Sequence, residues 1–74
     1  MRNEQQFCIQ ILDESSGEIS FFDRMKLYNS NYRVITSKER IKYYTCRVHA
    51  ELDFNKIKKY YKNNCLIEIV ECGK

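Results

Sequence analysis

The chain has 74 residues, of which 43% are hydrophobic and 31% are charged, a composition typical of globular rather than disordered proteins. A chain this short buries only about 60% of its unfolded surface, so we expect one domain spanning residues 1–74. This length excludes a doubly wound α/β enzyme and a barrel with a deep cleft. The net charge of +3 does not by itself indicate a class of binding partner.

The first two predicted strands form a hairpin. Residues 6–12 alternate apolar and polar side chains, which predicts a strand with one buried face. Residues 13–17 read Asp-Glu-Ser-Ser-Gly, and these residue types favour a turn. Residues 18–23 are again rich in Ile and Phe, so we predict that they pair with the first strand.

The next stretch leaves several readings open. Residues 24–31 fit either a short helix or a loop that ends in the turn cluster Asn-Ser-Asn. Residues 32–35 predict a short strand, and residues 36–39 fit either a hairpin turn or the start of a helix.

The segment 41–52 forces a choice between helix and strand. Ile41, Tyr44 and Val48 have helical spacing, but residues 46–53 alternate apolar and polar side chains without a fault. Tyr, Thr and Val also favour strands, so we predict a strand here. In that register Val48 is buried and costly to truncate, whereas His49 faces solvent and is dispensable.

A helix and a last strand complete the chain. Asp53 is a natural N-cap, and helical spacing follows at Phe54, Ile57 and Tyr61. The pair Asn63-Asn64 predicts the end of the helix, and the apolar residues within 65–72 predict a strand.

The predicted order is therefore β-β-(β)-β-α-β. This is a small two-layer α+β domain, with one mostly antiparallel sheet of four to five strands and one helix, in the C-terminal half, packed on a face. The helix stripe would face strand residues that form the expected core: Phe7, Ile9, Ile11, Val48, Ala50, Leu52, Ile67 and Ile69.

The four cysteines, Cys8, Cys46, Cys65 and Cys72, are expected to be free thiols. The first residues have no apolar run of the signal-peptide kind, and a free cysteine within a strand behaves as a small buried hydrophobe. We therefore expect a reducing, cytoplasmic setting, which is the host cytoplasm if the protein is phage-encoded. No stretch has the roughly 18 apolar residues that a membrane span needs.

Charge is distributed unevenly along the chain. Residues 1–23 have one base and five acids, a net charge of −4, whereas residues 24–62 have eleven bases and three acids, a net charge of +8. All six tyrosines fall in this basic part. Lys and Arg interleaved with Tyr suit nucleic acid, through phosphate contacts and base stacking. They equally suit an acidic protein surface, or a solvated helix face with Tyr packed beneath it.

Two candidate surfaces follow from the predicted fold. One helix covers only one face of a sheet, and an open face with apolar and aromatic side chains needs a partner unless residues 24–31 or the tail fold over it. The partner would be a larger protein, a protein–nucleic acid complex, nucleic acid itself or a second copy in a homodimer. The residues expected on this face to bind the partner are Tyr43, Thr45, Arg47, His49, Leu66 and Val70. A secondary basic face on the helix would comprise Lys56, Lys59 and Lys62.

No motif indicates catalysis, a cofactor or a metal. Cys46 and His49 have a spacing that zinc sites use, but positions i and i+3 of a strand point to opposite faces, and no Cys-x-x-Cys pair accompanies them. A nucleophilic pair of His49 with Cys8 or Cys46 would lack an orienting third group. We therefore expect a binding protein rather than an enzyme.

Ile, Lys, Asn and Tyr make up 28 of the 74 residues, a bias that fits A+T-rich coding. With the small size and the lack of a catalytic motif, this resembles, in kind, the small phage proteins that block host defence, anti-CRISPR proteins among them. The resemblance implies a phage or mobile-element accessory protein that inhibits or modulates a host protein machine. The basic middle differs from the acidic surfaces of DNA mimics, and the alternative is a nucleic-acid-binding module that uses this basic, Tyr-rich segment.

Overall fold

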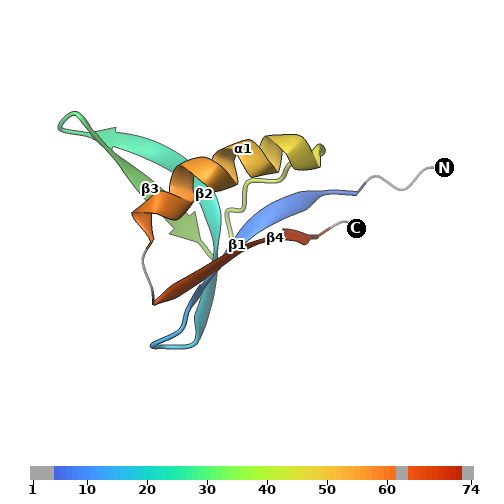
Figure 1. Cartoon of the computed structure of the whole chain (residues 1–74), viewed down its shortest axis with the longest axis horizontal. Helices are drawn as coiled ribbons and strands as arrows, with labels where there is room; N and C mark the ends of the chain where they lie inside the picture. Colours follow the sequence, from blue (N-terminus) through green and yellow to red (C-terminus); the bar gives the residue numbers. More distant parts are fainter. Residues whose placement is uncertain (1–4, 62–63, 73–74) are drawn as a thin grey trace.

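The computed structural model describes residues 5–61 and 64–72. These residues form a four-stranded sheet in the order β3-β2-β1-β4, with every neighbouring pair antiparallel, and a helix that lies across it (Figure 1). The α+β prediction is therefore confirmed. The elements, in chain order, are β1 (Phe7–Asp13), β2 (Glu18–Tyr28), β3 (Asn31–Ser37), α1 (Arg47–Ile57), the short 3₁₀ turn η1 (Lys58–Tyr60) and β4 (Cys65–Glu71). Within the described residues no helix is long and apolar enough to cross a membrane.

Two tight turns build the β1-β2-β3 meander. In the first, the Asp13 carboxylate accepts hydrogen bonds from the backbone N–H and the hydroxyl of Ser15, and Gly17 adopts a positive φ of 80°. In the second, Asn29 and Ser30 both have positive φ, at 48° and 70°, as in the two-residue turn whose twist matches a hairpin. Residues 24–28 belong to β2, so the helix and the loop left open for them are wrong, whereas the turn predicted at Asn29-Ser30-Asn31 is confirmed.

A β-bulge divides the long strand β2. The register with β3 shifts between Phe22 and Arg24, so Asp23 is an extra residue on β2. Without the bulge, Phe22 and Met25 would face opposite sides, because their separation is odd. With it, Phe22 is buried and Met25 packs against the same core.

Helix α1 begins at Arg47, so the strand predicted over residues 41–52 is wrong, as is the N-cap at Asp53. The misleading alternation arose because Val48 and Leu52 are 59% and 57% exposed: two apolar side chains on the solvent face of a helix imitate a strand. The buried helix residues are Ala50 and Ile57. Within the predicted strand only Tyr44 forms β pairing, as an isolated antiparallel bridge to Phe7.

The core lies between α1 and the sheet. The helix packs on β1 and β4, and partly buried side chains such as Ile67, Ile69 and Phe54 close its margin. Val48 and Leu52, which were expected in this core, are outside it. The buried apolar residues of the cluster are Phe7, Ile9, Ile11, Phe22, Tyr44, Ala50 and Ile57.

The helix register predicts the cost of two truncations. Ile57 has no exposed surface, so Ile57→Ala should cost about 2–5 kcal/mol of unfolding free energy through lost burial and a cavity. Val48→Ala should change it by no more than about 0.5 kcal/mol, because the side chain faces solvent. Urea denaturation of both variants provides the measurement. Equal costs would contradict the register.

One substitution in the β2–β3 turn should increase the stability of the domain. Ser30 pays a steric penalty at positive φ that glycine does not, and Asn-Gly is the favoured pair for this turn. Ser30→Gly should therefore raise the free energy of unfolding by roughly 0.4–1 kcal/mol. The matched control is Ser16→Gly in the other turn. Ser16 itself has no positive φ, so glycine there relieves no strain, removes the hydrogen bond from the Glu18 N–H to the Ser16 hydroxyl and adds freedom to the unfolded chain. A gain at position 16 and none at position 30 would contradict the turn geometry.

Candidate binding surfaces

The structure places the six partner-binding residues predicted from the sequence on two different surfaces. Leu66 and Val70 lie on the side of β4 that faces away from α1, because their neighbours Ile67 and Ile69 face the core. The other four belong to the connection before the helix and to its first turn: Tyr43, Thr45, Arg47 and His49. Their placement on the open sheet face was wrong, since it assumed a strand where the chain forms a helix.

The open sheet face nevertheless carries apolar side chains on both sides of the polar pair Gln10↔Glu68. Cross-strand pairing places Ile19, Leu12 and Leu66 in one row across β2, β1 and β4, and Val70 pairs with Cys8 further along the same face. Ile19 and Leu66 are 44% and 46% exposed. The strand and turn formed by residues 24–31 extend away from this row and do not cover it (Figure 1).

A second surface arises where β2 separates from β1. Their pairing ends at Gln10↔Phe21, and the connection from β3 to α1 fills the space that β2 leaves. The Lys42 backbone N–H donates to the Phe22 carbonyl at 3.0 Å, and Tyr44 exchanges two backbone hydrogen bonds of 2.8 Å with Phe7. These bonds hold the connection between the two strands.

The diverging β2–β3 hairpin and α1 enclose a groove of about 700 Å³. Its walls come from β2, β3, the connection, α1 and η1, and they combine positive charge with aromatic rings. Two of those rings, Tyr32 and Tyr60, are 56% and 45% exposed. The lining residues are Phe22, Arg24, Met25, Tyr32, Lys42, Asp53, Lys56, Lys59 and Tyr60.

One carboxylate, Asp53, lies among the groove cations. Its Oδ2 accepts a 2.6 Å hydrogen bond from the Tyr44 hydroxyl and lies 3.4 Å from Lys42 Nζ. Burial, followed by the hydrogen bond to Asp53, raises the pKa of Tyr44 far above its usual value, so this tyrosine remains a neutral donor. The Asp53 charge is thus directed into the protein and offsets Lys42.

The remaining groove cations differ in their partners. Arg24 pairs with the neighbouring carboxylate of Asp23. Lys56 and Lys59 form no ion pair with any described residue. The groove therefore has two lysines available to neutralise an anion.

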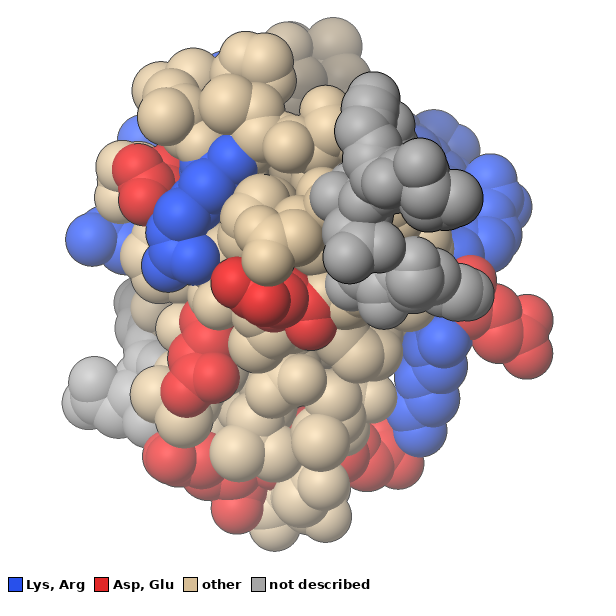
Figure 2. All heavy atoms as spheres, turned by 90° about the vertical axis from the view of Figure 1, so that its right-hand side faces the viewer, with Lys and Arg blue, Asp and Glu red and all other residues tan. Residues whose placement is uncertain are grey.

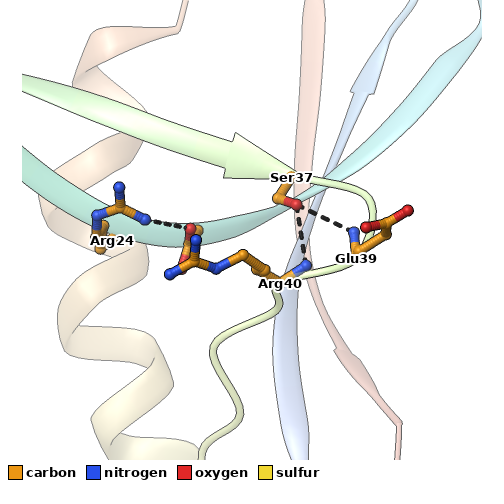
Figure 3. A network of polar contacts seen from close by, with 5 residues as sticks. Arg24, Ser37, Glu39 and Arg40 are labelled. Carbon is orange, nitrogen blue, oxygen red and sulfur yellow. Dashed lines mark hydrogen bonds and ion pairs between the residues drawn. The ribbon is translucent and has the colours of Figure 1, made fainter.

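A polar turn after β3 leads into the connection. The Ser37 hydroxyl accepts hydrogen bonds from the backbone N–H groups of Glu39 and Arg40, at 3.0 and 2.9 Å. Figure 3 shows this turn, with the Arg40 side chain extending in the direction of Arg24. The turn ends β3, so residues 36–39 form neither a hairpin turn nor a helix start.

Acidic and basic side chains occupy different parts of the surface. Figure 2 shows acidic groups gathered mainly in the lower part of the view, towards the β1–β2 turn, and most basic groups higher up. On the face shown in Figure 2, acidic and basic side chains are therefore separated in space as well as along the sequence.

Some predicted residues do meet, on a different surface. Tyr43, Thr45 and His49 line a shallow depression beside α1, together with Lys56. This depression adjoins the groove, because Lys42, Asp53 and Lys56 line both. Lys56 and Lys59 of the predicted basic face both line the groove, whereas Lys62 lies outside the described residues.

The helix also changes the geometry of Cys46 and His49. They lie at the N-cap and in the first turn of α1, so the strand argument that separated them was wrong. Even so, residues 5–61 and 64–72 contain no group of three or more His, Cys, Asp or Glu side chains that could hold a metal ion.

The groove was not predicted from the sequence. The basic helix face and the tyrosines of the middle segment were the available signals, but Arg24, Tyr32 and Lys42 meet α1 only because the β2–β3 hairpin diverges from β1.

Comparison of the chain with protein-family models, curated proteins and solved structures finds no match.

Proposed function

We propose that this protein is a non-enzymatic binding module whose groove between the β2–β3 hairpin and α1 binds single-stranded nucleic acid. The observation that carries the proposal is the convergence of Arg24, Lys42, Lys56 and Lys59 with two exposed tyrosine rings in one groove. A cytoplasmic protein–nucleic acid machine of a host cell is the expected source of such a strand.

The two residue types in the groove supply two complementary contacts. Lysine and arginine neutralise phosphates and release their counterions, and tyrosine rings stack on unpaired bases. Tyr32 on β3 and Tyr60 in η1 come from opposite walls, so a strand in the groove would have an aromatic ring on either side. An acidic peptide would contact the same cations and rings, so direct binding of an oligonucleotide is what distinguishes the two occupants.

Binding of a fluorescent oligothymidylate, followed by anisotropy over a range of salt concentrations, tests the proposal. In Lys56→Gln/Lys59→Gln the slope of log affinity against log salt should fall by about 1.4, since each single-strand phosphate contact contributes about 0.7. Tyr32→Ala should weaken binding by about 1–3 kcal/mol through lost stacking.

The matched control is Lys38→Gln/Lys58→Gln, which removes the same charge from two lysines that do not line the groove. It should keep the salt slope. If both double variants weaken binding equally, the attraction is general and the groove is not the site; if the wild-type chain does not bind, the proposal fails.

The uncovered sheet face supports a second candidate function, in which the protein docks on a larger protein and inhibits or modulates it. The row Ile19, Leu12 and Leu66 provides a flat apolar area, and such areas mark protein contacts. A phage accessory protein acting on a host machine would use it in this way.

Leu66→Lys tests this second candidate. Position 66 is half exposed, so the charge should leave the fold intact while abolishing co-purification of a stoichiometric partner from the natural host. The groove variant Lys56→Gln/Lys59→Gln should retain that partner. Retention by Leu66→Lys and loss by the groove variant would instead place the partner at the groove.

A further inference from the structure

Two cysteines from opposite ends of the described chain meet on the sheet face that lies away from α1. Cys8 lies in β1, and Cys72 follows β4 directly. Cys8 pairs with Val70, and the Cys72 backbone N–H donates to the Gln6 carbonyl at 2.8 Å. The two cysteines are therefore diagonal neighbours on adjacent antiparallel strands, with both side chains on one face.

Their sulfur atoms are 2.9 Å apart, although both are free thiols in the structure. A disulfide bond is about 2.05 Å long, so closing it requires a movement of less than about 1 Å. The expectation of free thiols rested on the first residues of the chain and on single cysteines within strands, and it did not consider a pair across two strands.

We propose that Cys8 and Cys72 form a reversible disulfide when the protein meets a peroxide oxidant. In a reducing cytosol the pair stays as two thiols, and transient disulfides there are usually redox-responsive. The proposal stands on the geometry of the pair and is independent of what binds in the groove.

The two sulfurs have different environments, which assigns their order of reaction. Cys8 is only 1% exposed, and burial raises its pKa to about 12, so it remains a protonated thiol. Cys72 is partly exposed, and accessible thiolates are the first to be oxidised. Cys72 is therefore the peroxide-reactive residue and Cys8 the resolving one.

The chemistry balances in two steps. The Cys72 thiolate attacks one peroxide oxygen and becomes a sulfenic acid, and the hydroxide released takes up the proton that Cys72 lost. The Cys8 sulfur then attacks the sulfenic sulfur, the S–S bond forms, and the displaced hydroxyl leaves as water with the Cys8 proton. Two electrons pass from the sulfurs to the peroxide, and two waters form.

The disulfide would fasten the end of the edge strand β4 to the central strand β1. It closes a loop that contains nearly the whole chain, and the restriction of the unfolded state grows with loop length. Oxidation should therefore stabilise the domain, without reaching the groove on the other side of the sheet.

The test treats the full chain with hydrogen peroxide, followed by peptide mapping without reductant and thermal unfolding. We expect a monomer lighter by two hydrogen atoms, a Cys8–Cys72 cross-linked peptide, and a rise in the unfolding midpoint of about 5 °C or more. Dithiothreitol should reverse all three changes.

Cys72→Ser, which leaves the buried Cys8 in place, should show neither the cross-link nor the rise. The matched control Cys46→Ser/Cys65→Ser should show both, because it keeps the pair. Overoxidation of Cys72 to a sulfinic acid without a cross-link would overturn the proposal. Cross-linking solely through the exposed Cys46, which the control removes, would overturn it as well.

Discussion

Tyr44 fixes the arrangement on which both candidate surfaces depend. Its backbone exchanges two hydrogen bonds with Phe7 at the start of β1, and its hydroxyl donates to Asp53 in the middle of α1. The Tyr44 side chain is buried and that of Asp53 is 24% exposed, so water competes with these bonds only in part. One residue thereby attaches the connection to the sheet and the helix to the connection, and it sets where α1 crosses the strands.

The position of Tyr44 follows from the divergence of β2 and β1. The bulge at Asp23 turns β2 away while keeping Phe22 and Met25 on the core side, and the connection takes the vacated place beside β1. A continuous β1–β2 ladder would leave no space for it. The groove is thus the cavity between a hairpin that leaves the sheet and a helix that stays on it, and its cations come from segments on both sides of the divergence.

Local patterns sufficed for the β1–β2 hairpin and for β4, because turn residues and alternating apolar side chains act over a few positions, whereas the second half of β2 was not predicted. They failed for α1 because Val48 and Leu52 are apolar on its solvent face, and the same error moved Tyr43 and His49 to the wrong surface. Leu66 could be placed correctly because β4 has a regular alternation. The groove could not be predicted, since Arg24 and Lys56 are brought together by a bulge and an irregular connection, for which the sequence has no simple signal.

Chain length explains why so much surface stays uncovered. A helix of 11 residues is about 16 Å long at 1.5 Å per residue, whereas a strand of 11 residues such as β2 extends about 36 Å at 3.3 Å per residue. The helix can therefore cover β1 and β4 on one side, but neither the far end of the β2–β3 hairpin nor the opposite sheet face. The far end of the β2–β3 hairpin carries polar and cationic side chains, which water solvates, so this surface is stable without a partner. The opposite sheet face keeps Ile19 and Leu66 exposed to water at a cost in free energy, which contact with another molecule would remove.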